Sequence, residues 1–108
     1  MKKAEQAAIN ERIDNMFNEV LEASRICSVT WSRLRTCHAE VAYIECFYVL
    51  KSYDTVVAWI DTRTDTLYDF LREVYGYTST SAQHISKFEK DYCAGKWNCA
   101  ERLTWREV

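Results

Sequence analysis

The clearest pattern in the chain is a helical repeat of apolar positions near its beginning. Apolar side chains recur there at the 3.6-residue period of an α-helix, on a stripe about 100° wide with acidic and amide side chains around it. The stripe runs through Ile9, Ile13, Met16, Phe17 and Val20 and ends at Ser24. The pattern predicts an amphipathic helix over residues 1–27. Its stripe either packs in the core of the chain or offers its first part to a second copy or a target protein.

From Val41 onward the apolar period changes from 3.6 to two, which is typical of β-strands. One face of the first run carries Ile44, Cys46, Tyr48 and Leu50. The second run carries Val56, Ala58 and Ile60 on one face, and Val57 and Trp59 on the other. Polar segments at residues 52–55 and 61–66 are the expected turns, and a third strand begins at Leu67. The sequence therefore predicts a β meander over residues 41–75, while periodicity does not decide the structure of residues 28–40.

A second helix is expected after this meander. Thr80 and Gln83 have the spacing of a capping box, in which each side chain satisfies a backbone N–H of the other residue. Gly95 is suited to end the helix, so we expect it over residues 80–94, followed by a possible strand over residues 97–108. These elements predict a single α+β domain. Its three- to four-stranded antiparallel sheet would carry both helices on one face.

Length and charge restrict the function classes. At 108 residues and 12.8 kDa, the chain is large enough to fold as one domain around its own core. The net charge is −2, whereas a protein that holds duplex nucleic acid through its phosphates usually carries a basic surplus. We therefore expect a protein partner ahead of nucleic acid. The sequence also lacks a signal-peptide apolar segment and any run near roughly 18 apolar residues, so we expect a cytoplasmic protein without membrane contact.

The cysteines do not form a recognisable metal motif. The five are Cys27, Cys37, Cys46, Cys93 and Cys99. They include no Cys-x-x-Cys pair and show no zinc-finger spacing with histidine. In a reducing cytoplasm, scattered cysteines are usually small core residues. We expect free thiols, no metal and no cofactor.

Catalysis has no positive signal in the sequence. A nucleophile needs a histidine within hydrogen-bond reach and a third group that orients the base, and no spacing indicates such a set. His84 lies at the border of the second helix's buried stripe, where we expect it to bond a neighbouring hydroxyl or carbonyl. The hydroxyls of residues 78–81 could seat an anion at the helix start. Ser and Thr are also good caps, however, and we favour that reading, so no catalytic residue is expected and the chain is predicted not to be an enzyme.

A basic and aromatic cluster gives the alternative function. Arg25, Trp31, Arg33 and Arg35 stand in a stretch without acidic residues between positions 23 and 39. Guanidinium and indole groups suit stacking and backbone contact with single-stranded nucleic acid. The same cluster could instead be a solvated face that complements an acidic neighbour. A nucleic-acid-binding regulator is therefore the alternative to a protein-binding chain.

Two segments give the chain its most distinctive sequence. The first is Ser-Tyr-Asp-Thr-Val-Val-Ala at residues 52–58, and the second is Tyr-Gly-Tyr-Thr-Ser-Thr-Ser-Ala-Gln-His-Ile at residues 75–85. They resemble small proteins of unassigned function from phages and other mobile elements of bacteria. Those proteins share a Ser-Tyr-x-Thr-x-Val-Ala strand and a Tyr-Ser/Thr-x-Thr-Thr/Ser-x-x-His-Ile helix start. The resemblance spans about residues 41–98 and does not reach the N-terminal helix.

The resemblance implies a setting for the protein. Small acidic proteins of mobile elements often bind a host or phage protein, and some, such as anti-CRISPR proteins, inhibit host defence nucleases. We therefore expect a non-enzymatic accessory protein that binds another protein, with a homodimer through the N-terminal helix as a further expectation. The candidate binding residues are Tyr53, Tyr75, Tyr77, Thr80 and His84, together with Trp31, Arg33 and Arg35.

Overall fold

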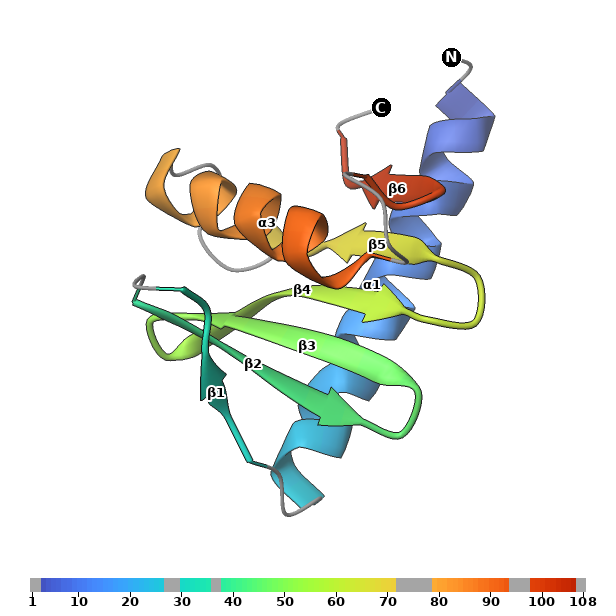
Figure 1. The fold of residues 1–108 in the computed structure, drawn as a ribbon. Helices are drawn as coiled ribbons and strands as arrows, with labels where there is room; N and C mark the ends of the chain where they lie inside the picture. The colour runs from blue at the N-terminus through green and yellow to red at the C-terminus, as the bar shows by residue number, and fades with distance from the viewer. Residues whose placement is uncertain (1–2, 27–29, 36–37, 72–78, 94–97, 107–108) are drawn as a thin grey trace.

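The computed structural model describes residues 3–26, 30–35, 38–71, 79–93 and 98–106. The chain opens with helix α1 (Lys3–Ile26) and continues with strands β1 (Ser32–Arg33), β2 (Ala39–Ile44), β3 (Phe47–Ser52), β4 (Thr55–Asp61) and β5 (Thr66–Asp69). It ends with helix α3 (Ser79–Tyr92) and strand β6 (Glu101–Thr104). The strands form one sheet in the order β1-β2-β3-β4-β5-β6, in which only the pair β5–β6 is parallel (Figure 1).

The α+β class and the helix-first order are confirmed, but the sheet has six strands and not three to four. The first apolar run, predicted as one strand, folds as a hairpin of two strands. Ile44 at the end of β2 pairs with Phe47 at the start of β3. The turn contains Glu45 with a φ of 57°, a left-handed conformation that sequence rules assign to Gly or Asn. The reversal places Ile44 on the opposite face of the sheet from Leu50, contrary to the prediction.

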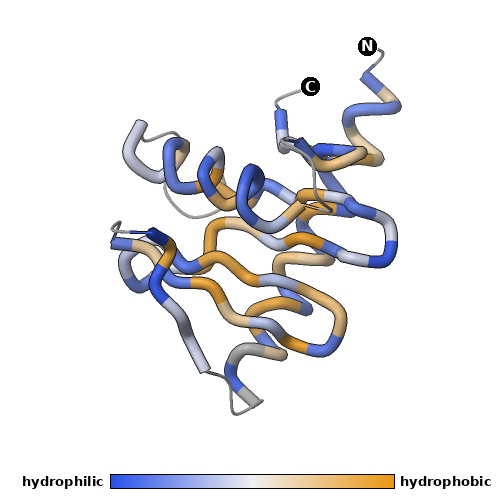
Figure 2. The backbone as a smooth tube through the Cα atoms, viewed as in Figure 1, coloured by the Kyte–Doolittle hydropathy of each residue, from blue (hydrophilic) through white to orange (hydrophobic). Residues whose placement is uncertain are grey.

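The two helices cover opposite faces of the sheet, so the prediction that both pack on one face is wrong (Figure 1). The core under α3 joins Ile85 and Phe88 to Val41, Leu50, Ala58, Ile60 and Leu67. The core under α1 joins Ile13 and Val20 to Ile44, Val49, Trp59, Tyr68 and Phe70. Apolar positions gather on the central strands (Figure 2). They contribute to a core on both faces of the sheet, so each face requires its own cover.

A β-bulge in β4 decides which residues face each helix. Lys51 pairs with Val56 while the residue before it pairs with Ala58, which leaves Val57 as the extra residue. Val57 therefore packs under α3 beside Ala58, and Val56 joins Trp59 under α1. The prediction assigned Val56 and Val57 to the wrong faces of the sheet, because it assumed strict alternation along the strand. A bulge shifts the two-residue period by one position.

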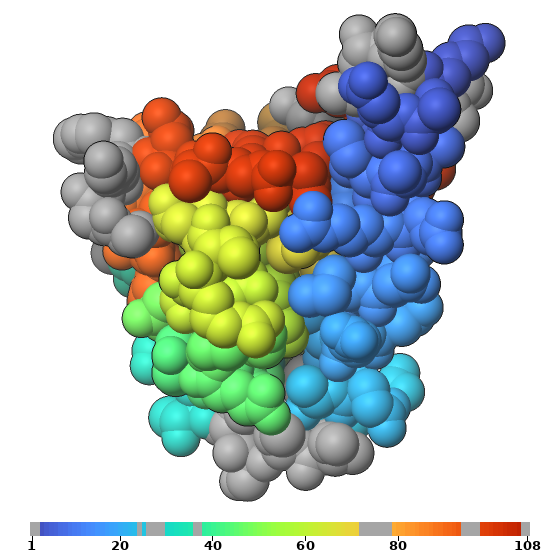
Figure 3. Space-filling model, turned by 90° about the vertical axis from the view of Figure 1, so that its right-hand side faces the viewer, coloured from blue at the N-terminus to red at the C-terminus, as the bar shows by residue number. Residues whose placement is uncertain are grey.

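The apolar stripe of α1 is used in the core of the chain itself. Ile13 and Val20 are fully buried, and Ile9, Met16 and Phe17 pack against the same cluster. Figure 3 shows α1 running along one side of the molecule, beside the segments that contain β5 and β6. The homodimer through this helix stays a prediction, and the central residues of the stripe are not exposed to take part in it.

Polar contacts fasten the beginning of α1 to the C-terminal strand. The Gln6 side-chain amide donates to Asn10 Oδ1 at 2.8 Å and to the Thr104 carbonyl at 3.1 Å. The Asn10 amide donates to the Arg106 carbonyl at 2.6 Å, and Asn10 Oδ1 accepts from the Arg106 backbone N–H at 3.0 Å. Both side chains are buried, so these bonds satisfy polar groups that would otherwise destabilise the packing of α1 on β6.

Helix α3 begins at Ser79, one residue before the predicted start. Thr80 lies in the first turn of the helix, and the capping role of its side chain stays a prediction. The strand expected after this helix is present as β6, but it pairs with β5 in parallel because α3 serves as the crossover between them. Neither of the two described helices combines the length and apolar character needed to cross a membrane.

The expectation of free thiols is wrong for two of the five cysteines. Cys93, directly after α3, forms a disulfide with Cys99, two residues before β6, and the two Cα atoms are 5.1 Å apart. Cys46 is a free, half-buried cysteine in the β2–β3 turn, and Cys27 and Cys37 lie outside the described residues. The disulfide therefore ties the end of the crossover helix to the start of the last strand.

Candidate functional site

The tip of the β3–β4 hairpin carries an exposed tyrosine in an unusual backbone conformation. Ser52 pairs with Thr55, so Tyr53 and Asp54 form a two-residue turn. Tyr53 has a φ of 56°, and a left-handed conformation costs a non-glycine residue about 1–2 kcal/mol. Its backbone N–H donates to the His38 carbonyl at 2.8 Å, and 51% of the residue is exposed. A large aromatic residue thus occupies a strained, half-exposed position that glycine would fill more easily.

Two histidines contact the Tyr53 ring. The His38 ring stacks on it nearly in parallel, with centroids 5.7 Å apart and an angle of 11° between the planes. The His84 ring lies tilted by 51° at a centroid distance of 5.8 Å. We call these three residues the Tyr53 cluster. Its members come from the β3–β4 turn, from the residue before β2 and from α3, so the fold gathers them from three separate segments.

His84 is anchored from below by buried hydroxyls. Its Nδ1 atom lies 2.8 Å from Ser52 Oγ, which in turn lies 3.1 Å from Ser81 Oγ. The expected bond from His84 to a hydroxyl is confirmed, although the hydroxyl comes from β3 and not from a residue near it in sequence. Burial lowers the pKa of His84 below its usual value, and the charges of Lys87 and His38 lower it further.

This Ser–His pair does not have the accessibility of a catalytic dyad. A nucleophile and its base must reach a substrate, but Ser52 is 0% exposed and His84 is 5% exposed. The lowered pKa favours the neutral imidazole, which can both donate and accept hydrogen bonds inside the protein. The arrangement therefore serves as a buried polar anchor that links β3 to α3 beneath Tyr53.

A cavity of about 520 Å³ opens beside the Tyr53 cluster. It is lined by Arg33, His38, Ala39, Glu40, Tyr53 and Asp54. The lining carries both signs of charge. Positive and negative side chains also alternate across the neighbouring strands: Arg33 pairs in register with Glu40, and the Glu40 carboxylate lies 3.7 Å from Lys51 Nζ. The sequence prediction found Tyr53 and Arg33 but missed His38, Glu40 and Asp54, because the register of β1, β2 and β3 is what brings them together.

The basic and aromatic cluster expected from the sequence does not form one surface. Trp31 is half-buried against the core under α1, and Lys51 Nζ lies 4.2 Å from the centre of its ring. The Arg35 guanidinium binds both carboxylate oxygens of Asp91 in α3, at 2.8 and 2.7 Å. This bond lowers the pKa of Asp91. Arg25 lies exposed in the last turn of α1, so these groups do not gather on one element, and Trp31 and Arg35 contact other side chains of the chain.

The remaining predicted site residues separate into two groups. Thr80 is exposed in the first turn of α3, and it does not line the cavity beside Tyr53. Tyr75 and Tyr77 lie outside the described residues. The structure thus brings together Tyr53, His84 and Arg33 of the predicted set, with Tyr53 and Arg33 on the cavity and His84 behind the tyrosine ring.

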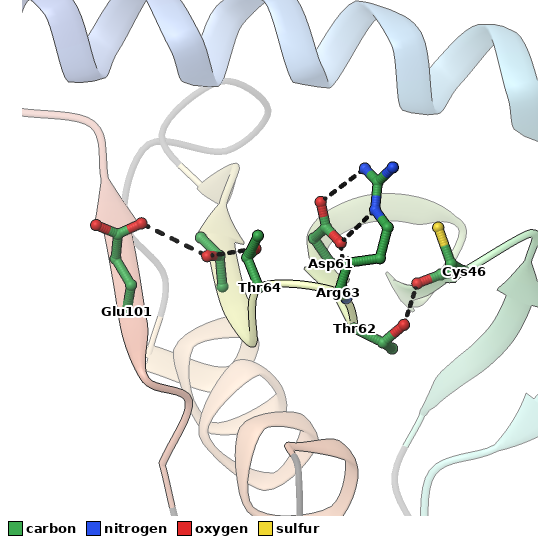
Figure 4. A network of polar contacts seen from close by, with 7 residues as sticks. Cys46, Asp61, Thr62, Arg63, Thr64 and Glu101 are labelled. Carbon is green, nitrogen blue, oxygen red and sulfur yellow. Dashed lines mark hydrogen bonds and ion pairs between the residues drawn. The ribbon is translucent and has the colours of Figure 1, made fainter.

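A second polar network surrounds the β4–β5 turn (Figure 4). Arg63 binds both carboxylate oxygens of Asp61 at 3.1 and 3.0 Å, and this hydrogen bonding lowers the pKa of Asp61. The Thr62 hydroxyl donates to the Cys46 carbonyl at 2.6 Å, which joins this turn to the β2–β3 turn. On the other side, hydroxyls of Thr64 and Thr66 lead to Glu101 of β6. The network fixes the geometry of the turn from both neighbouring segments.

Comparison of the chain with models of known protein families, with curated proteins and with solved structures gave no match. The resemblance to proteins of phages and mobile elements therefore stays a prediction from the two sequence segments.

Proposed function

We propose that the chain is a non-enzymatic protein-binding protein and that it docks its partner on the Tyr53 cluster and the adjoining cavity. The observation that carries the proposal is the backbone of Tyr53. A half-exposed aromatic residue is held at a hairpin tip in a left-handed conformation, and strained positions of this kind concentrate at functional sites. Tyrosine is also among the residues that dominate binding energy at protein interfaces.

The support beneath Tyr53 adds to the argument. Contacts with two histidine rings and the buried hydroxyls behind His84 hold the tyrosine ring in one place. A side chain that is fixed before binding loses little conformational freedom when a partner covers it. The Tyr53 cluster therefore has the properties of a preorganised anchor.

The charges around the cavity favour a protein over a nucleic acid. The lining residues include two acids, Glu40 and Asp54, and one arginine. A rim with both signs of charge suits a protein surface, which also carries both signs. A phosphate backbone would require a basic surplus. The alternative, a nucleic-acid-binding regulator that uses Arg25, Arg33, Arg35 and Trp31, lacks a continuous surface among the described residues.

The biological setting is a proposal that rests on the sequence resemblance alone. We propose that the chain is an accessory protein of a phage or mobile element, that it acts in the cytoplasm and that it binds a host or phage protein. An inhibitor of a host defence nuclease, as anti-CRISPR proteins are, is the specific case that this setting favours.

The proposal is tested by isolating the partner from the native host and measuring its affinity for the protein and two variants. Tyr53→Asn removes the ring, while asparagine tolerates a positive φ. Loss of an interface anchor is worth about 2 kcal/mol, which is roughly a 30-fold weaker complex. Tyr43→Asn is the matched control, because Tyr43 is 56% exposed and lies at the other end of β2.

Equal affinity of Tyr53→Asn and the unchanged protein would refute the proposed docking site. The nucleic-acid alternative has its own signature. Binding to single-stranded DNA would weaken steeply with salt, and Arg33→Ala together with Arg35→Ala would reduce that salt dependence. We expect neither behaviour.

A further inference from the structure

Three groups that can bind a metal converge where α3 ends and β6 begins. Cys93 and Cys99 meet there, and Asp65 reaches them from the β4–β5 turn. The ligand atoms of the three residues all lie within 4.8 Å of one another, and both cysteines are buried. Around a tetrahedral zinc ion with Zn–S bonds of about 2.3 Å, ligand atoms stand about 3.8 Å apart. The three residues therefore approach the spacing of a zinc site.

Neighbouring hydrogen bonds orient these groups. Asp65 Oδ2 accepts from the Ala100 backbone N–H at 2.8 Å, a bond that holds the carboxylate beside the residues that precede β6. The backbone N–H of Cys99 donates to the buried carboxylate of Glu89 at 3.1 Å. Partners that hold ligands in this way are characteristic of metal sites and raise their affinity.

We propose that the reduced protein binds one zinc ion through Cys93, Cys99 and Asp65, and that the disulfide and the zinc site are alternative states of the same residues. A reductant such as a phosphine takes up oxygen from water and supplies two electrons and two protons, which convert the disulfide into two thiols. Zinc then replaces both thiol protons, which leave to solvent. The sulfur atoms need to part only from about 2.0 Å to about 3.8 Å.

The cavity next to these residues supplies an entry path and a fourth ligand position. Its volume is about 450 Å³, and Cys93 and Asp65 lie in its wall. Tyr48, Thr62 and Tyr92 complete much of the remaining lining. Three protein ligands with a fourth position open to water or to another molecule are the arrangement of zinc sites that are not purely structural. Two thiolates also select zinc over magnesium and calcium, which prefer oxygen ligands.

No local sequence pattern reveals this site, because its third ligand is distant along the chain. Cys93 and Cys99 alone do not have the spacing of a zinc motif, and Asp65 precedes Cys93 by 28 residues. Parallel pairing of β5 with β6, in which Thr66 is the partner of Glu101, brings the residues before these strands together.

The experiment measures zinc binding by the full chain in which Cys27, Cys37 and Cys46 are replaced by Ser, so that only the two proposed thiols remain. The protein is reduced with a phosphine and titrated with Zn²⁺ against a chromophoric chelator, and the oxidised protein is titrated in parallel. Co²⁺ is used as a second probe, because its visible absorption reports tetrahedral coordination and thiolate ligands. Circular dichroism of every variant verifies that it is folded.

We expect one equivalent of zinc in the reduced protein and none in the oxidised protein. Cys93→Ser should weaken zinc binding by at least about 100-fold, and Asp65→Asn by at least about 10-fold. Loss of an outer-shell partner alone weakens metal binding by about 10–100-fold, and these residues are proposed as direct ligands. Asp54→Asn, an acid at the opposite hairpin tip, should leave the affinity unchanged. Failure of the reduced parent chain to bind stoichiometric zinc would overturn the proposal. So would undiminished affinity in folded Asp65→Asn, which would show that the aspartate is not a ligand.

Discussion

The buried hydroxyl of Ser52 offers a sharp test of how the Tyr53 cluster is supported. Ser52→Ala removes the group that meets His84 Nδ1 at 2.8 Å and Ser81 Oγ at 3.1 Å. Alanine retains the backbone pairing of β3, so the change removes the hydroxyl and leaves the strand in place. Leaving a buried polar group without its partner costs about 1–3 kcal/mol, and we expect about 2 kcal/mol because two neighbours are affected.

The loss is measured by urea unfolding and by thermal unfolding. A domain of this length loses roughly 4 °C in Tm for each kcal/mol, so a decrease of about 8 °C is expected. Ser86→Ala is the matched control, since Ser86 is an exposed serine on the same helix as His84, and surface substitutions usually stay within about 0.5 kcal/mol. If Ser52→Ala and Ser86→Ala have the same urea and thermal unfolding midpoints, Ser52 is not the anchor that the geometry indicates.

Three further outcomes are expected. Because folding lowers the pKa of His84, the unfolded chain takes up the proton first as pH falls, and the free energy of unfolding should decrease from about pH 7 to about pH 5. This pH dependence of stability should be smaller in His84→Asn. Asn10→Ala should cost about 2 kcal/mol in urea unfolding by breaking the part-buried bonds from α1 to Arg106, two residues after β6, and wild-type stability would contradict that role. Arg35→Ala and Asp91→Ala should each cost less than about 1 kcal/mol of stability, because the ion pair is largely exposed. A double-mutant cycle in which the coupling energy of the pair persists at high salt would contradict this expectation.

The elements that the sequence predicted are those whose pattern is local. The helical period around Ile13 and Val20 reports directly that one side of α1 is buried, and both residues are fully buried in the core. The start of α3 was also found, to within one residue. The number of strands was not, because the β2–β3 turn at Glu45 contains neither Gly nor Asn, and the bulge at Val57 has no signature in a single sequence.

The candidate site shows the same limit. Tyr53 and His84 were found because both belong to the two distinctive segments, whereas the contact of Tyr53 with His38 depends on strand register. Once β2 and β3 are known to turn at Glu45, Ala39 must pair with Ser52, and the residues just beyond them become neighbours. The partnership of Asp65 with the two cysteines likewise requires the parallel pairing of β5 and β6, which follows from tertiary packing and not from any local pattern.

Site-specific photo-crosslinking in cells of the native host tests the central claim most directly. A photoreactive phenylalanine analogue replaces Tyr53 in one version of the chain and Tyr43 in another. The two positions are similarly exposed and lie five residue positions apart along the strands, roughly 17 Å. The account predicts a discrete adduct with one protein from position 53 and none with that protein from position 43. Adducts from position 43 alone, or the same set of adducts from both positions, would contradict docking on the Tyr53 cluster.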